Sequence, residues 1–362
     1  MIVYWLFFIF PAVLAISGQA RTPNLLTNYQ FLNIGKLWWL FIFSLTILIG
    51  LRHEVGGDWD NYIRIFSGES SINSLSQIHF NRDPGYQLIN YLSSILGFGI
   101  YGVNIICGAI FSSGLALFCR NLPRPLLALT VAIPYLIIVV SMGYSRQAVA
   151  LGIAMIGLVC LGRNKKITFI LLIFFAATMH KSAILLIPIA ILASTKNRLI
   201  GFFWMGVIAI CFYFIFLADT LSILYGNYTN LDDAASQSDG AMIRLLMNVV
   251  PAFLFLIFYK KFKIPAIEKS LWRWFSLISI FLIIILFLTP LSSAIDRIAL
   301  YMIPLQLVVF SYLPDIFGKK RAIHRWIIVS IISYYGLVLF VWLNFATHAH
   351  FWVPYQNILF LW

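Results

Sequence analysis

The sequence predicts an all-helical, polytopic integral membrane protein. Hydrophobic residues make up 62% of its 362 residues and charged residues only 10%, whereas soluble domains average about 25% charged residues. The mean hydropathy of +0.93 reflects apolar runs that recur along the whole chain. Since one span needs roughly 20 apolar residues, a chain of this length has room for about 12 transmembrane helices with short loops. This composition excludes a soluble enzyme.

Each expected helix is an apolar run bounded by polar residues. The first run has no basic residues before it and no small-residue cleavage site after it, so we interpret it as a retained span and not as a signal peptide. In chain order the runs are Ile2–Ser17, Leu37–Leu51, Ile100–Cys119, Leu126–Met142, Gln147–Leu161, Ile167–Met179, Ser182–Ala193, Leu199–Ala218, Leu245–Tyr259, Leu271–Leu288, Ile298–Leu313 and Trp326–Phe345. The segment 167–193 leaves two alternatives open, namely two short helices or one interrupted helix.

The expected domain organisation is a single transmembrane domain over residues 1–362. It has two outer loops, 52–86 and 219–244, and a C-terminal tail, 346–362, whose Trp and Tyr residues are typical of the membrane interface. The cysteines lie in or at the ends of apolar runs without metal-ligand spacing, so we expect them to pack and to bind no metal.

Charge placement predicts the orientation of the chain. The formal net charge is +13. If loop 52–86 is outside, successive loops alternate between the two sides of the membrane. This alternation places most of the 25 Lys and Arg residues inside, but it places only two of the 12 acidic residues there, Glu268 and Asp315. This distribution follows the positive-inside rule and leaves both termini outside. The positive charge therefore sets topology, the expected partner is the lipid bilayer, and we expect no nucleic acid.

The basic residues on the expected outer side are the informative ones. They are Arg52, Arg64, Arg82, Arg146, Lys181, Arg244 and Arg297. Arg146 and Arg297 each open an apolar run, where a guanidinium and the backbone N–H groups of a helix start converge on an anion. Arg52 ends the second apolar run, and we expect it at the same depth in the membrane as Arg146 and Arg297. We interpret these three arginines as ligands of a lipid-linked diphosphate; the alternative for each alone is a snorkelling interfacial arginine.

Two further segments supply candidate catalytic residues. In RHEVGGDWDNYIRIF, Asp58 follows a Gly-Gly turn and stands four residues before Tyr62. Asp58 is a candidate general base for a sugar hydroxyl, and a helix cap is the alternative. His180 stands between two short apolar runs, and neutral imidazole accepts a proton near pH 7. A structural histidine is the alternative there.

The order of these motifs resembles the EpsG family of Wzy-type polysaccharide polymerases. The motifs are RHEVGGDWDNYIRIF, RDPGYQLINYL, SRQAVA, HKSAILLIP, DRIALY and a C-terminal PY. The resemblance implies a multi-pass protein of the bacterial inner (cytoplasmic) membrane with a glycosyltransferase architecture of the GT-C type and an active site facing the periplasm. It points to Arg52, Asp58, Tyr62, Tyr86, Arg146, Gln147, His180, Arg297, Tyr301 and Tyr355, and we count Arg82, Lys181 and Arg244 as further substrate contacts.

The resemblance implies a polymerase that joins undecaprenyl-diphosphate-linked oligosaccharide repeat units for O-antigen (lipopolysaccharide), capsule or exopolysaccharide. We expect a metal-independent, inverting glycosyl transfer without a cofactor, with His180 or Asp58 as the base. A chain-length regulator and a flippase are partners expected from the family alone. The alternatives are a lipid-linked oligosaccharide flippase, an O-antigen ligase, and another GT-C glycosyltransferase in which Asp58 or Asp60 holds a divalent cation.

Overall fold

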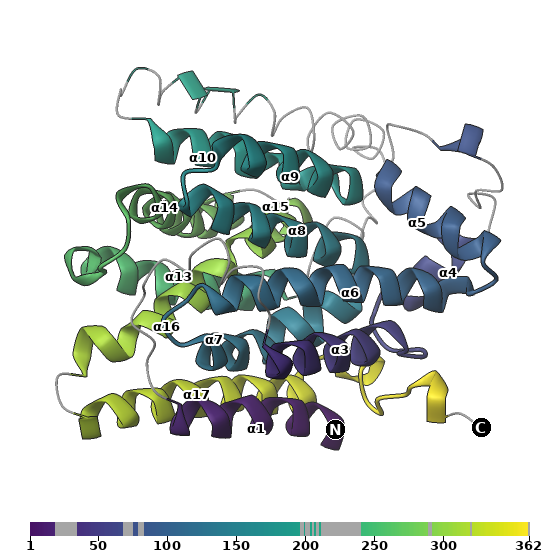
Figure 1. Cartoon of the computed structure of the whole chain (residues 1–362), viewed down its shortest axis with the longest axis horizontal. Helices are drawn as coiled ribbons and strands as arrows, with labels where there is room; N and C mark the ends of the chain where they lie inside the picture. The colour runs from purple at the N-terminus through teal and green to yellow at the C-terminus, as the bar shows by residue number, and fades with distance from the viewer. Residues whose placement is uncertain are drawn as a thin grey trace. The chain divides into compact units, whose positions relative to one another are not determined.

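The computed structural model is helical. It describes residues 1–18, 35–67, 75–78, 83–195, 199, 203–204, 206–207, 210, 240–288, 292–318 and 321–360. Among these residues there is no strand, and the only extended pairing is a bridge between Arg52 and Asn357 (Figure 1). The expected all-helical class is therefore confirmed.

Apolar helices account for most of the described chain. Five of them are long and apolar enough to cross a membrane by length and composition, namely Gly99–Arg120, Ser145–Gly162, Ala266–Leu288, Ala294–Phe317 and Ala322–Phe345. Shorter apolar helices cover Ile2–Ser17, Lys36–Gly50, Pro125–Ser141, Lys166–Met179, Lys181–Ser194 and Ala241–Ile257. The chain is thus consistent with a polytopic membrane protein, and the number of twelve spans stays a prediction.

The segment 167–193 forms two helices. Helix α9 (Lys166–Met179) ends directly before His180, and a short 3-10 turn, η3 (Lys181–Leu185), leads into α10 (Leu186–Ser194). The run Leu199–Ala218 lies almost wholly outside the described residues, as does most of the expected outer loop 219–244.

The chain divides into two compact units, each described by itself. The first comprises Met1–Val159, Phe174–His180 and Phe310–Trp362. Its helices are α1 (Ile2–Ser17), α3 (Lys36–Gly50), α4 (Trp59–Ser67), α5 (Pro84–Ile95), α6 (Gly99–Arg120), α7 (Pro125–Ala132), most of α8 (Ser145–Gly162), and α17 (Arg321–Phe345), with parts of α9 and α16 (Pro304–Phe317) and the short turn η1 (Leu75–Gln77).

In the first unit, α6 packs closely against both α3 and α8. A Cβ atom on Gly50 of α3 would lie 2.6 Å from the Cα atom of Ile105, and one on Gly152 of α8 would lie 2.7 Å from that of Phe111. Small residues at such contacts let helix backbones approach each other, which is the usual way that membrane helices gain packing energy. Because α6 contacts both neighbours, it fixes the end of α3 and the course of α8.

The C-terminal tail packs against the loop that follows α3, the first of the two loops expected on the outer side. Its 3-10 turns η7 (Ala349–Phe351) and η8 (Ile358–Phe360) flank an extended stretch. The backbone N–H of Gly56 donates to the carbonyl oxygen of Phe351 at 2.9 Å, and that of His53 to the carbonyl oxygen of Gln356 at 3.1 Å. The tail therefore supports the loop that follows α3.

A π-helical segment, η2 (Ile133–Ser141), continues α7 and receives the same tail. The indole N–H of Trp352 donates to the carbonyl oxygen of Ile138 at 2.8 Å, and the Tyr4 hydroxyl donates to the carbonyl oxygen of Trp352 at 2.8 Å. Wide helical turns of this kind are frequent at functional sites. Here the turn gives the buried indole of Trp352 an acceptor.

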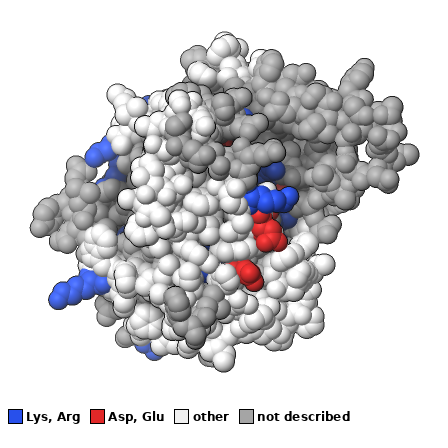
Figure 2. All heavy atoms as spheres, turned by 90° about the vertical axis from the view of Figure 1, so that its right-hand side faces the viewer, with Lys and Arg blue, Asp and Glu red and all other residues white. Residues whose placement is uncertain are grey.

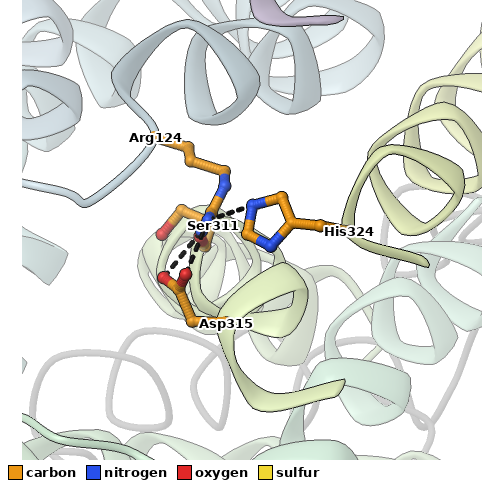
Figure 3. Close-up of polar contacts among 4 residues, drawn as sticks. All are labelled: Arg124, Ser311, Asp315 and His324. Atoms are coloured by element: carbon orange, nitrogen blue, oxygen red, sulfur yellow. Dashed lines mark hydrogen bonds and ion pairs between the residues drawn. The ribbon is translucent and has the colours of Figure 1, made fainter. Parts of the chain in front are cut away.

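Arg124, which we expected only as a topology charge, ties three helices of the first unit together (Figure 3). It precedes α7 and makes a bidentate ion pair with Asp315 of α16, with distances of 2.7 and 2.6 Å. It also donates to the carbonyl oxygen of Ser311 at 2.9 Å and to Nε2 of His324 on α17. Its side chain is only 6% exposed.

The second unit comprises Cys160–Ile173 and Lys181–Val309. Its main helices are α10, α13 (Ala241–Ile257), α14 (Ala266–Leu288) and α15 (Ser292–Met302), with a 3-10 turn, η6 (Tyr259–Lys261), after α13. A polar ladder joins α13 to its neighbours: Asn248 donates to the carbonyl oxygen of Ala299 at 2.8 Å and accepts from Gln306 at 2.7 Å.

Candidate functional site

Arg146 stands in the first turn of α8, as expected. Its Nη1 atom lies 3.1 Å from Oδ2 of Asp83, and its guanidinium lies 5.9 Å from the centroid of the Tyr86 ring. Its backbone N–H donates to the Tyr62 hydroxyl at 3.4 Å. With 35% of its side chain exposed, Arg146 is held by protein groups and still reaches the surface.

Tyr62 and Tyr86 form an aromatic wall beside Arg146. Both side chains are buried, and their ring centroids lie 6.0 Å apart. Burial raises the pKa of both phenols, so they remain neutral and can donate hydrogen bonds near neutral pH. Two predicted site residues are therefore brought together with Arg146, although their hydroxyls are not open to solvent.

His180 belongs to the same corner of the first unit. A Cβ atom on Gly85, at the start of α5, would contact the Thr178 hydroxyl and lie 2.8 Å from Cε of Met179. The end of α9 therefore lies against the start of α5, and His180 follows directly. Its backbone N–H donates to the carbonyl oxygen of Ala176 at 3.0 Å, and the residue is partly exposed.

Arg52 is buried, with 1% exposure. Its Nε atom donates to the carbonyl oxygen of Val55 at 3.1 Å and its Nη2 to the Ser145 hydroxyl at 2.7 Å, while Nη1 donates to the carbonyl oxygen of Ile49. Burial lowers the pKa of this guanidinium. These contacts tie the end of α3 to the first residue of α8, a geometry that favours positioning over direct contact with a ligand.

Asp58 is placed by a glycine turn. Gly56 has φ +108°, and a Cβ atom there would contact the carbonyl oxygen of Met142. Only glycine satisfies both requirements. The backbone N–H of Tyr62 donates to the carbonyl oxygen of Asp58 at 3.0 Å, so Asp58 directly precedes α4 and is partly exposed. Both alternatives, cap and base, are compatible with this placement.

The remaining candidates of the first unit are less accessible. Gln147 is buried in α8. The Tyr355 hydroxyl donates to the carbonyl oxygen of Leu48 at 2.8 Å and accepts from Asn357 at 3.0 Å, which links the tail to α3. Burial raises the pKa of Tyr355. Arg82 lies outside the described residues.

The second unit holds the other candidates. Arg297 is exposed on α15, but its expected place in the first helical turn is wrong, because α15 already begins at Ser292. Tyr301 is buried and accepts a hydrogen bond from Ser182 at 3.4 Å. Arg244 forms a buried ion pair with Asp296 at 2.9 Å. Lys181 is exposed at the start of η3.

Sequence reasoning missed Asp83 and Ser145. Asp83 directly precedes Pro84, the first residue of α5, and Ser145 opens α8. Both residue types are common at helix starts, so a helix-boundary signal was present in each case. Nothing in the sequence indicated that Asp83 would pair with Arg146, or that Ser145 would accept from Arg52.

The described part of the expected outer loop contains α4, η1 and the start of α5. Figure 2 shows a face on which most of the described surface is uncharged; acidic side chains lie beside basic ones in one group, and further basic side chains stand apart from it. Among the described residues of this loop, Glu54, Asp60 and Arg64 are exposed.

Comparison with known proteins identifies the family. The EpsG family model matches residues 36–357, a range that contains every candidate residue discussed above. No curated protein matches the chain significantly. No solved structure does so either. Since the matched range covers nearly the whole sequence and the described residues form apolar helices, the chain belongs to the EpsG family of polysaccharide-polymerase-like membrane proteins.

Proposed function

We propose that this protein is a Wzy-type polysaccharide polymerase of the bacterial inner membrane. It joins undecaprenyl-diphosphate-linked oligosaccharide repeat units at the outer, periplasmic face. The family match supports the reaction class. The observation that carries the site is Arg146, a partly exposed guanidinium in the first turn of α8 with an acidic partner and two tyrosine rings around it.

The start of α8 suits a diphosphate. Helix N-termini present backbone N–H groups and the positive end of the helix dipole, and a guanidinium adds charged donors in a planar fork. Arg52 holds Ser145, and with it the first turn of α8, in place. In this proposal Arg146 contacts the diphosphate and Arg52 positions the helix that presents it.

Asp83 is the counter-ion of Arg146 while the site is empty. An incoming diphosphate displaces the carboxylate, because it carries more negative charge and more acceptor oxygens than one carboxylate. The ion pair thus keeps Arg146 oriented. Anions that bind the guanidinium more weakly than Asp83 does will not displace this carboxylate.

The proposed reaction is a single displacement. The hydroxyl oxygen of the acceptor repeat unit attacks C1 of the donor sugar, and the bond from C1 to the diphosphate oxygen breaks with inversion. The electron pair leaves with the diphosphate, where Arg146 stabilises the developing charge. The hydroxyl proton passes to His180 or Asp58, both residues of the first unit.

Arg297 is the second proposed diphosphate ligand. It is exposed on α15, and the neighbouring Asp296 holds this helix to α13 through its ion pair with Arg244. A polymerase handles two lipid-linked substrates in each cycle, so a second cation for a second headgroup fits the reaction. Tyr301 and Lys181, which belong to the same unit as Arg297, are proposed to support the binding of this second headgroup.

Purified protein in detergent, supplied with undecaprenyl-diphosphate-linked repeat units, tests the function. We expect longer glycans with an inverted anomeric centre at each new linkage. A flippase makes no longer chains under these conditions. A ligase transfers glycan only when another acceptor is added, and a metal-dependent enzyme stops in EDTA and recovers with manganese or magnesium. Retention at C1 would overturn the single displacement.

A further inference from the structure

The turn between α13 and α14, together with the adjoining ends of the two helices, combines five cations with aromatic rings, and the proposed function does not use this region. We call the whole region the α13–α14 turn. The cations are Lys260, Lys261, Lys263, Lys269 and Arg273, and the rings are those of Phe255, Phe258, Tyr259 and Phe262. All of these residues belong to the second unit. On the expected topology the turn faces the inner side of the membrane, where basic residues set orientation. Orientation depends on the number of charges near a span and requires no particular arrangement of them.

The aromatic residues hold this turn in one conformation. Phe262 is 1% exposed, and its ring centroid lies 4.7 Å from that of Phe255. The ring of Tyr259 meets Phe255 edge-on at 5.7 Å. The backbone N–H of Lys261 donates to the carbonyl oxygen of Phe258 at 2.8 Å, which closes the short turn. The packed aromatic rings and this hydrogen bond therefore fix the backbone that carries the lysines of the turn.

Two of the cations converge on one ring. The Nζ atom of Lys269 lies 4.8 Å, and the Cζ atom of Arg273 5.9 Å, from the centroid of Tyr259. Lys269 and Arg273 are four residues apart on α14, so they share a helix face, and like charges in this arrangement repel each other. An anion that bridges both cations relieves this repulsion while the ring keeps their side chains in place.

Glu268, the acidic residue next to Lys269 in the described part of the chain, does not serve as that anion. Glu268 packs against the end of α8, where a Cβ atom on Gly162 would lie 2.8 Å from its Cδ atom. Its electrostatic partner there is Arg163. The carboxylate next to Lys269 in sequence is thus directed to a different cation.

The position of the turn identifies the ligand. Phe253 and Ile257 are 49% and 69% exposed on α13, and Phe281 is 58% exposed on α14, which is one of the candidate spans. Exposed apolar surface on such helices faces lipid chains. The cations begin where that surface ends, and this is the depth of lipid phosphates.

We propose that this turn is a binding site for the phosphate headgroup of an anionic phospholipid, such as phosphatidylglycerol, with Lys269 and Arg273 as its main ligands. The acyl chains of the same lipid lie along the exposed apolar faces of α13 and α14. The site is independent of the proposed reaction, and its test does not require catalytic activity.

The experiment uses the full chain, purified in detergent, with native mass spectrometry to count retained phosphatidylglycerol and phosphatidylcholine. A double variant, Lys269→Gln with Arg273→Gln, removes the converging cations. The matched control, Lys165→Gln with Lys166→Gln, removes two exposed cations from the turn between α8 and α9. We expect the wild type and the control to retain phosphatidylglycerol preferentially. The double variant should retain it about 25-fold more weakly, since each of the two cations contributes roughly fivefold near an anionic surface.

Three outcomes would overturn the proposal. They are equal retention of the two lipids by the wild type, an equal loss in the control, and displacement of the lipid by millimolar inorganic phosphate, which would indicate a free-phosphate site. Circular dichroism and the melting temperature of each variant in phosphatidylcholine identify misfolding. If the double variant misfolds, Tyr259→Leu replaces it, because this change removes the ring that organises the two cations and keeps their charge.

Discussion

Two arginine–aspartate pairs in the first unit differ in the number of contacts that the arginine makes and in how exposed its side chain is. Arg124 makes a bidentate pair with Asp315 and further bonds to Ser311 and His324, and it is 6% exposed. Arg146 makes one described ion-pair contact, to Asp83 at 3.1 Å, and is 35% exposed. The first arrangement leaves little room for a ligand and joins helices. The second keeps a charged group oriented at a surface, which is what a binding site needs.

Arg124→Ala should have the largest effect, and the effect should be on stability. Arg124 is buried whereas Asp315 is 44% exposed. Losing all four hydrogen bonds of the guanidinium should cost about 3–5 kcal/mol in total, because each bond to a charged group contributes about 1.5–3 kcal/mol and water regains part of this at the exposed carboxylate. We expect a clear fall in the melting temperature of the purified protein in detergent. Asp315→Asn, which keeps one acceptor for the guanidinium, should destabilise the protein less. Unchanged melting of both variants would contradict a structural role for this pair.

Arg146→Ala should instead reduce catalysis and leave stability nearly unchanged. Losing one preorganised donor to a developing negative charge costs about 2.7–4 kcal/mol, or roughly 100- to 1,000-fold in kcat. The measurement is glycan elongation by purified protein on lipid-linked repeat units. Arg64→Ala, at an exposed position of α4, is the control and should retain activity. Full activity of Arg146→Ala would remove this arginine from the site.

Asp83→Asn sharpens the comparison, because binding and turnover should change in opposite directions. Without the competing carboxylate, undecaprenyl diphosphate should bind about tenfold more tightly, since hydrogen bonds between charged groups contribute about 1.5–3 kcal/mol. Selectivity for diphosphate over monophosphate should fall, and elongation should slow because product leaves slowly. Titration calorimetry with both lipids measures this. Asp60→Asn, on the exposed face of α4, is the control. Weaker binding together with a lower melting temperature would indicate that the Asp83 pair only stabilises the fold.

Arg52→Lys should have the smallest effect and separates positioning from binding. A lysine keeps the charge and cannot make the same set of hydrogen bonds to Ile49, Val55 and Ser145. We expect a loss of about 1–2 kcal/mol in stability and a modest fall in kcat, with affinity for the diphosphate unchanged. Ser145→Ala should reproduce part of this effect. A large loss of affinity would show that Arg52 contacts the substrate directly.

Much of the fold could be predicted from local sequence. The described apolar runs form helices, Arg146 stands in the first turn of α8, and the chain breaks at His180. These features depend on residues close together in sequence, such as apolar continuity and a polar interruption. The start of α15 was misplaced, since the segment before Arg297 is polar enough to read as a loop and is nevertheless helical.

The pairing of charges could not be predicted in this way. Arg52, Arg124 and Arg146 look alike as isolated basic residues at the ends of apolar runs. Their partners are Ser145, Asp315 and Asp83, and they lie between 63 and 191 residues away. Which arginine is buried depends on how α3, α7 and α8 pack, and a local pattern carries no such information.

By itself, the sequence determined the membrane class, the helical spans of the described residues and the family, because hydrophobicity, run length and motif order are properties of the linear chain. Only the tertiary structure decided which charged side chains pair with each other and join helices, and which remain at a surface. Burial and pairing depend on distant segments meeting. Arg124 and Arg146 demonstrate this difference, since each is an arginine at the start of an apolar helix. Packing buries Arg124, which joins helices, and leaves Arg146 partly exposed as a candidate ligand of the substrate.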